Sequence, residues 1–216
     1  MSLDRVQTVL RFLDRDMTPV EIGADRAPFA SAFARSFARP CYASEVADGP
    51  YQALVQSIGE QGLSGLVKCY RADGLNSFPP DADTALICGM GGFTISRILG
   101  RAGSLASLKT LILEPQSHSE LVRQAVIDQG FVPVAECYVG EATRFYPVIK
   151  AERRPLEVPY SPAELAFGRI PIRNRDLLLR AYLEKLVKGF DKKFLDQKSG
   201  DNIELRRLAL DLLSRW

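Results

Sequence analysis

The sequence contains few of the residues on which the commonest catalytic and metal sites depend. Among its 216 residues only His118 is a histidine, and the four cysteines lack the spacing of metal ligands. These absences argue against Ser-His-Asp and Cys-His catalysis and against most zinc sites, so we expect no metal. The cysteines lie in apolar, strand-like runs, which predicts buried thiols rather than disulfides. His118 precedes a helical pattern over 119–129, which predicts a surface position at a helix N-terminus.

Long hydrophobic segments are also missing. No apolar run approaches the roughly 18 residues needed to span a bilayer, and residues 1–15 are polar and amphipathic, without a signal-peptide core. The hydrophobic fraction of 46% and the charged fraction of 25% are ordinary for a globular protein. We therefore expect a cytoplasmic protein without membrane contact, with one α/β domain and a small appendage.

A glycine cluster, Gly89-Met-Gly-Gly92, is the most informative motif that is present. It follows an apolar run over 83–88, which predicts a strand, and precedes a helical pattern over 93–101. Glycine destabilises strands and helices, so a cluster indicates that the backbone comes close to another group. At the carboxyl end of a parallel strand that group is usually a ligand, although a tight strand-to-helix turn would need the same residues.

Three predicted strands upstream end in residues typical of a nucleotide site. The first, 20–22, ends at Gly23; the second, 41–45, ends at Glu45, which lies 22 residues after Gly23; the third, 66–70, precedes Asp73-Gly74. A glycine turn followed by an acid at this distance is the general form of a nucleotide-binding unit, in which the acid binds ribose hydroxyls. A complete G-x-G-x-x-G is absent, which argues against a dinucleotide and leaves S-adenosylmethionine as the favoured cofactor.

The order of elements predicts a seven-stranded methyltransferase sheet, an α/β Rossmann-like fold. Five strand–helix units are followed by two successive strands, 131–138 and 144–151, with no room for a helix between them. A proline-rich break over 154–171, with one helical turn near 163–167, ends this domain. Two amphipathic helices, 174–197 and 203–216, are joined by a turn at 199–202 and predict a helical hairpin. We therefore divide the chain into residues 1–153 and 154–216.

The two parts differ in charge. Residues 1–150 carry 14 Lys and Arg against 16 Asp and Glu, whereas residues 151–216 carry 14 against 10. A basic tail beside a near-neutral domain is compatible with a nucleic-acid partner, but a solvated helix face has the same composition.

Taken together, these blocks resemble the bacterial tRNA (adenine-22-N1)-methyltransferases. The resemblance covers most of the chain and rests on eight segments in order: 3–10, 21–25, 44–50, 73–75, 83–92, 111–115, 144–146 and 167–186. It implies a methyltransferase domain that uses S-adenosylmethionine and a C-terminal helical domain that helps to bind tRNA. The chain departs from the family at Arg26, where His is usual, at Glu114-Pro-Gln116, where Gln-Pro-Asn is usual, and at Pro147, where Glu is usual.

The resemblance also assigns site residues. The implied cofactor contacts are Glu21, Gly23, Ala24, Glu45, Val46, Asp73, Gly74, Gly89 and Met90. The acids at 21 and 25 suit a cationic sulfonium and ammonium. The substrate candidates are Arg26, Gly91, Gly92 and Tyr146, together with the basic side chains of the tail, Arg173, Arg175, Arg180, Lys185, Lys188, Lys192 and Lys193.

N1 of adenine has a free lone pair, so it needs positioning more than deprotonation to attack the sulfonium methyl group. Asp25 is the catalytic candidate, as an acceptor near the exocyclic amine, with the Gly89 carbonyl as a second. Asp25 could equally be the N-cap of a helix over 27–38. Tyr146 could stack on the base or belong to the core.

Three other functions stay open from the sequence. The chain could methylate another RNA or a small molecule, it could be a non-catalytic RNA-binding protein with a degenerate cofactor fold, or it could be a nicotinamide oxidoreductase. The single glycine after the first strand disfavours the last of these.

Overall fold

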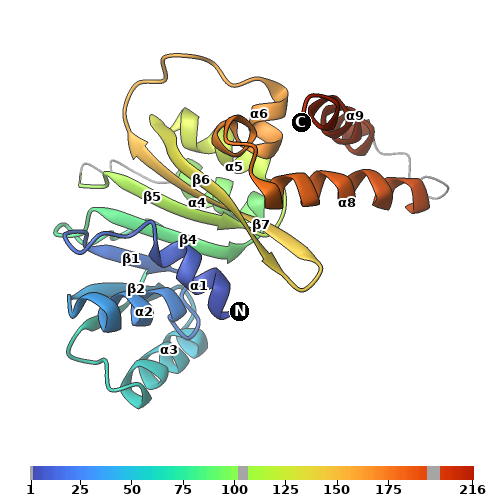
Figure 1. The fold of residues 1–216 in the computed structure, drawn as a ribbon. Coiled ribbons are helices and arrows are strands. Elements are labelled where there is room, and N and C mark those ends of the chain that lie inside the picture. The colour runs from blue at the N-terminus through green and yellow to red at the C-terminus, as the bar shows by residue number, and fades with distance from the viewer. Residues whose placement is uncertain (1, 102–106, 194–199) are drawn as a thin grey trace.

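The computed structural model describes residues 2–101, 107–193 and 200–216, and for 190–193 and 200–202 it describes the backbone alone. Its centre is one seven-stranded sheet (Figure 1). The strands are β1 (Pro19–Ile22), β2 (Cys41–Glu45), β3 (Val67–Arg71), β4 (Thr84–Met90), β5 (Thr110–Pro115), β6 (Phe131–Glu141) and β7 (Arg144–Arg153). Their order is β3-β2-β1-β4-β5-β7-β6, and β7 runs antiparallel to both of its neighbours. The predicted methyltransferase sheet, including its antiparallel pair, is confirmed.

Helices cover both faces of this sheet. They are α1 (Leu3–Leu10), α2 (Pro28–Phe37), α3 (Asp48–Glu60), α4 (Gly92–Arg101) and α5 (Ser119–Asp128). Side chains alternate along β4, so that Leu86 and Cys88 pack in the core under α1, α2 and α3, whereas Ala85 and Ile87 pack against α4 and α5. Burial on both faces explains why these strands are almost continuously apolar in sequence.

In the part of the chain that the structure describes, four helices follow the sheet. They are α6 (Pro162–Phe167), α7 (Arg169–Arg173), α8 (Leu177–Lys193) and α9 (Gly200–Ser214), and in Figure 1 α8 extends beyond the edge of the sheet. The prediction of one helix from residue 174 is wrong, because α8 begins only at Leu177. The Asp176 carboxylate sets this start, since its Oδ1 accepts hydrogen bonds from the backbone N–H groups of Leu178 (2.8 Å) and Leu179 (3.0 Å).

The predicted turn between the last two helices is wrong where the structure describes it. Residues 200–202 belong to α9, and Ser199 lies outside the described residues. Sequence alone favoured a turn because Gly, Asp and Asn are common in turns and at N-caps. These residue types also begin helices, so the same signal is compatible with the first turn of α9.

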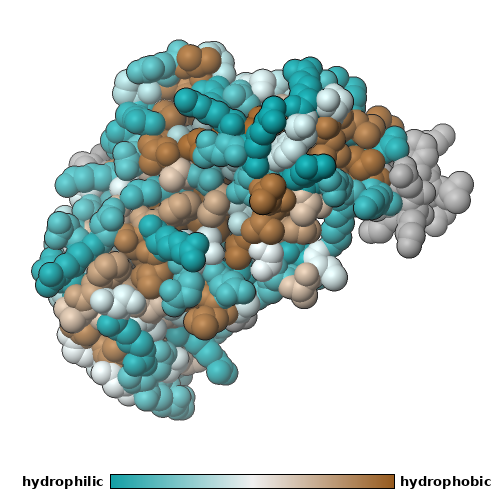
Figure 2. Space-filling view, viewed as in Figure 1, coloured by the Kyte–Doolittle hydropathy of each residue, from teal (hydrophilic) through white to brown (hydrophobic). Residues whose placement is uncertain are grey.

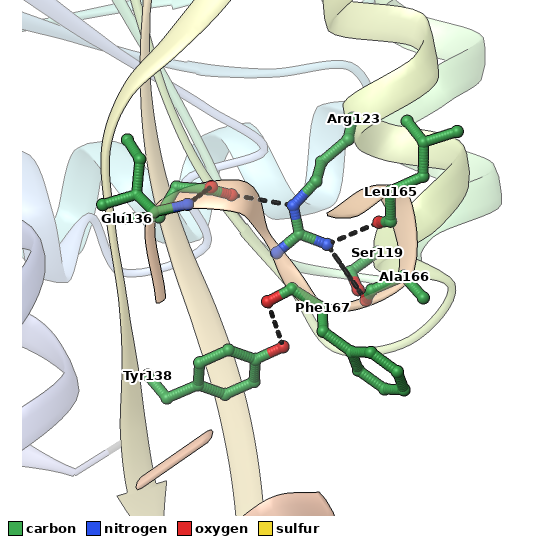
Figure 3. Close-up of polar contacts among 8 residues, drawn as sticks. Ser119, Arg123, Glu136, Tyr138, Leu165, Ala166 and Phe167 are labelled. Carbon is green, nitrogen blue, oxygen red and sulfur yellow. Dashed lines mark hydrogen bonds and ion pairs between the residues drawn. The ribbon is translucent and has the colours of Figure 1, made fainter. Parts of the chain in front are cut away.

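A buried arginine fastens α6 to the sheet (Figure 3). Arg123 of α5 is fully buried, and its Nε donates a hydrogen bond to Glu136 Oε1 of β6 at 2.7 Å. Its Nη1 donates to the carbonyl oxygens of Leu165 (2.8 Å) and Ala166 (3.1 Å). Because the last carbonyl groups of a helix lack partners within that helix, the guanidinium satisfies the end of α6 and a buried carboxylate at once.

The C-terminal helices also share an apolar core with β6. Tyr138 of β6 donates a hydrogen bond from its hydroxyl to the Phe167 carbonyl at 3.2 Å, and its ring stacks on Tyr182 of α8 with centroids 5.6 Å apart. The other buried members of this cluster are Ala166, Phe167, Leu179, Leu183 and the α9 residue Ala209. Figure 2 shows hydrophobic side chains over these helices as well as at several other places on the same face. The division at residue 153 coincides with the end of β7 and remains a prediction.

Candidate active site

A cleft opens at the carboxyl ends of β1, β2, β3 and β4, on the side covered by α4. Parallel α/β sheets bind ligands at this edge, because loops and helix N-termini meet there. The structure brings six of the predicted cofactor residues into its lining: Gly23, Glu45, Val46, Asp73, Gly74 and Met90. The apolar walls come from Ile22, Leu75 and Ile98.

Gly23 allows the first loop to pass close to Met90. Its φ is +64°, and an added Cβ would lie 2.2 Å from the Met90 methyl carbon. The Gly23 and Ala24 N–H groups donate to the Ser44 carbonyl at 2.9 and 3.0 Å. Any other residue at position 23 would be strained and would push Met90 toward the cleft. Ala24 itself is buried and lies outside the lining.

Glu45 joins the second strand end to the first loop. Its Oε1 accepts a hydrogen bond from the Asp25 backbone N–H at 2.7 Å, while the side chain still lines the cleft. The next residue, Val46, is 55% exposed at the rim, and its carbonyl accepts a hydrogen bond from Arg71. The Asp25 loop is therefore fixed by the same acid that the sequence assigns to ribose.

Glu21 lies beneath the cleft and outside its lining. Its carboxylate is 4% exposed and accepts a hydrogen bond from the Ala30 N–H, in the first turn of α2, at 2.7 Å. Burial raises its pKa to about 8, against the lowering effect of the α2 N–H groups. The N-cap interpretation of Asp25 is wrong, because the residue before α2 is Ala27 and the acid that reaches the helix N-terminus is Glu21.

The glycine cluster serves two purposes. Gly89 lies at a bulge between β4 and β5, and its N–H donates to Glu114 Oε2 at 3.0 Å. At Gly92 an added Cβ would lie 2.3 Å from the His118 carbonyl oxygen and 2.5 Å from that of Ser117. The close approach at Gly92 is thus to the chain's own backbone. Gly91 is less restricted, since its added Cβ would lie 3.4 Å from Ser117 Oγ.

An ion pair that the sequence did not reveal lies behind Gly89. Arg5 of α1 donates to Glu114 Oε2 at 2.6 Å and to Glu141 Oε2 at 2.9 Å. Burial raises the pKa of Glu114, and the neighbouring Arg5 opposes that shift, whereas hydrogen bonds from Ser2 and Arg5 lower the pKa of Glu141 to about 2. Tyr146 is buried in the core with the Arg5 guanidinium 4.3 Å from its ring centroid.

The predicted basic residues do not converge. Arg26 is exposed on the loop after β1. Arg173 lies in a groove with Val132 and Arg154, at the edge of the sheet opposite the cleft. Arg175 contacts the α9 C-terminus through the Arg215 carbonyl. The positions of Arg173 and Arg175 depend on how α7 packs. The spacing of residues in the sequence does not determine that packing.

The basic side chains of α8 lie nearer the cleft end of the sheet. Arg180 pairs with Glu184 at 3.0 Å, Lys185 contacts the Thr143 carbonyl in the β6–β7 turn, and Lys188 is exposed one turn further on. The side chains of Lys192 and Lys193 lie outside the described residues.

Sequence reasoning missed three polar residues of α4 that line the cleft: Thr94, Arg97 and Arg101. Positions 94, 97 and 101 share one face of a helix, which was the available signal. Nothing in the sequence, however, indicated that this face points toward Glu45 and Asp73.

The part of the chain that the structure describes holds neither a metal-site cluster nor a membrane-spanning helix. Within residues 2–101, 107–193 and 200–216, no group of three His, Cys, Asp or Glu side chains is arranged to hold a metal ion. Across the same ranges no helix combines the length and the apolar character that crossing a bilayer requires. All four cysteines are free, and Cys41 and Cys88 are buried.

Comparison with known proteins gives a consistent set of matches. The sequence model of a family described as tRNA (adenine(22)-N(1))-methyltransferase matches residues 19–210. A curated protein of that name from Bacillus subtilis (strain 168) is 28% identical over 170 residues, covering 77% of this chain and 71% of the relative. A Streptococcus pneumoniae structure in complex with S-adenosyl-L-methionine has a TM-score of 0.83 and 25% identity, over 99% of this chain and 100% of that one. The crystal structure of a Bacillus subtilis M1A22 tRNA methyltransferase, at 20% identity and a TM-score of 0.78, covers 99% and 96% and shares the fold.

Proposed function

We propose that this chain, which belongs to the tRNA (adenine(22)-N(1))-methyltransferase family, methylates adenine 22 and that the strand-end cleft is its active site. The family match and the related structures show an S-adenosylmethionine-dependent methyltransferase that acts on N1 of adenine in tRNA. The observation that carries the site assignment is the meeting of Glu45, Asp73 and Gly23 at one edge of the sheet. The family match removes the support for a nicotinamide oxidoreductase.

The cleft residues fit S-adenosylmethionine. One oxygen of Glu45 holds the Asp25 N–H, which leaves the other free to accept from ribose hydroxyls. Asp73 and Gly74 would contact the adenine edge, between the apolar walls formed by Leu75 and Ile98. Glu21 would act indirectly, by holding the start of α2 and with it the loop from Gly23 to Asp25. When bound, the cofactor supplies an electrophilic methyl group on a sulfonium.

The chain's own residues position the acceptor. Asp25 lies outside the cleft lining, but it is exposed and its backbone N–H is bonded to the lining residue Glu45, which supports a role for its carboxylate as the acceptor of a hydrogen bond from the exocyclic amine of adenine. That bond would strengthen as positive charge develops on the purine. The Gly89 carbonyl would be the second acceptor, at the bulge where the Gly89 N–H donates to Glu114. The mechanism needs no base, because N1 attacks through a lone pair.

The target base lies in a folded tRNA and would have to be extruded to enter the cleft. Lys185 and Lys188 of α8 would contact phosphates on the cleft side, which the contact of Lys185 with the β6–β7 turn supports, whereas Arg173 lines a groove at the other edge of the sheet. From a tRNA substrate we infer a cytoplasmic enzyme.

Methylation of an unmodified tRNA transcript, followed by mass mapping of nuclease fragments, tests this function. We expect one methyl group on the fragment containing adenine 22 and none when that base is replaced by guanine. Asp25→Ala should lower kcat by about 100-fold with little change in cofactor affinity, by analogy with the loss of one electrostatic contact in other active sites. The matched control is Asp16→Ala, also an exposed aspartate on a loop. Methylation at another base would overturn the assignment.

A further inference from the structure

An exposed aromatic pair stands beside the cleft and has no role in the proposed chemistry. Phe93 is 66% exposed at the start of α4, and its ring centroid lies 4.5 Å from that of His118 at the start of α5, with the planes inclined by 53°. His118 is the single histidine of the chain and is itself 48% exposed. A phenylalanine exposed to this degree leaves apolar surface in contact with water, and burying that surface would be favourable.

The pair is held rigidly. Gly92, directly before Phe93, approaches the 117–118 backbone so closely that no side chain would fit, and its N–H donates to the Ser117 carbonyl at 2.9 Å. His118 Nδ1 lies 3.1 Å from Glu120 Oε1, which limits rotation of the imidazole. The two helix starts are thereby joined through their backbones, which keeps Phe93 and His118 next to each other while most of the Phe93 ring stays exposed.

Its place on the sheet indicates the ligand. Phe93 and His118 follow the carboxyl ends of β4 and β5, the neighbouring strands of the site, and the next residue, Thr94, lines the cofactor cleft. Enzymes that extrude a base contact its flanking nucleotides, and unpaired bases of RNA commonly stack on aromatic side chains.

We propose that Phe93, supported by His118, is a stacking surface for an unpaired tRNA base that neighbours the target adenine. The proposal rests on the proposed function. It adds a contact in which the Phe93 ring stacks on the π-face of a base, in place of an ionic contact with phosphate. It therefore separates RNA recognition at the rim of the cleft from the phosphate contacts assigned to α8.

Binding and methylation by four variants of the full chain test the proposal. Phe93→Ala and Phe93→Leu should each weaken tRNA affinity by about tenfold, within the range measured for base–aromatic stacking. Phe93→Trp should restore it, and His118→Ala should cause a smaller loss. Stacking releases no counterions, so the salt dependence of binding should stay unchanged, and so should the affinity for S-adenosylmethionine. The matched control is Val158→Ala, because Val158 is 61% exposed and distant from the site.

A modified substrate identifies the base. An abasic nucleotide on one side of the target adenine should remove the tenfold difference between the wild type and Phe93→Ala, because the two changes delete the same contact. Full affinity in Phe93→Leu, or an unchanged tenfold difference with abasic nucleotides on either side, would overturn the proposal. If wild-type protein binds tRNA without methylating it, the proposed function fails, while the stacking surface is still decided by the binding data.

Discussion

Two buried carboxylates, one under the cofactor cleft and one at the joint with the C-terminal helices, are stabilised in different ways. Glu21 has backbone N–H groups of α2 as its partners, and burial raises its pKa to about 8. Glu136 pairs with Arg123, and both side chains have no exposed surface. Under the cleft, the acid Glu21 is stabilised by the N-terminus of a helix. At the joint, Glu136 is stabilised by the opposite charge of Arg123, so removing either side chain leaves the other as an uncompensated buried charge.

Arg123→Leu should have the largest effect, which is a loss in the free energy of unfolding. Removing one member of a buried ion pair typically costs about 3–5 kcal/mol of the free energy of unfolding. The Leu165 and Ala166 carbonyls would lose their donor at the same time. Urea unfolding measures the loss, and Arg123→Leu combined with Glu136→Leu should recover part of it. Arg180→Leu, in an exposed pair, is the control, and a loss in Arg123→Leu no larger than in this control would refute the interpretation.

Glu45→Ala should have the next largest effect, on cofactor binding. Losing a charge-assisted hydrogen bond to ribose costs about 1.5–3 kcal/mol, so the affinity for S-adenosylmethionine should fall roughly tenfold or more. Glu45→Gln keeps an acceptor for the Asp25 N–H and should lose less. Calorimetric titration gives both values, with the exposed Glu60→Ala as control; an unaltered dissociation constant in Glu45→Ala would exclude Glu45 from the site.

Glu21 should make the free energy of unfolding fall as pH rises, whereas an acid whose pKa is lowered by an ion pair makes it rise. Because its folded pKa is about 8 against an ordinary value of 4.5, the folded chain keeps a proton that the unfolded chain releases between these values. The free energy of unfolding should therefore fall as pH rises through this window, by at most about 1.4 kcal/mol per pH unit from this group.

Glu21→Gln cannot titrate and should lack that fall. The measurement is urea unfolding of the variant and the wild type at about pH 5.5 and about pH 7.5, both of which lie roughly half a unit or more inside the window between 4.5 and 8. The advantage of the variant over the wild type should grow with pH. A constant difference at the two pH values would show that Glu21 is already ionised in the folded protein.

The smallest effect is expected from single lysines of α8. Lys188→Ala should lower the salt slope of tRNA binding by about one while leaving cofactor affinity unchanged, because one phosphate contact is lost. Arg173→Ala removes the same charge at the opposite edge of the sheet and should leave the slope unaltered. Equal slopes in all three proteins would mean that the α8 lysine is merely solvated.

The sequence by itself determined the strand order along the chain, the glycine turn at Gly23, and the acids Glu45 and Asp73 at strand ends. These features are local, since a short apolar run and the residue that ends it can be read within a few positions. Their meeting in one cleft then follows from the parallel arrangement, in which all carboxyl ends share an edge.

Only the tertiary structure decided which acid does what. It placed Glu21 rather than Asp25 at the N-terminus of α2, and it paired Glu114 with Arg5, 109 positions earlier in the chain. It also put Arg173 on the far edge and Phe93 against His118. The physical reason is that a charge or a ring is assigned its partner by packing between distant segments, and spacing along the chain carries no record of which segments will touch.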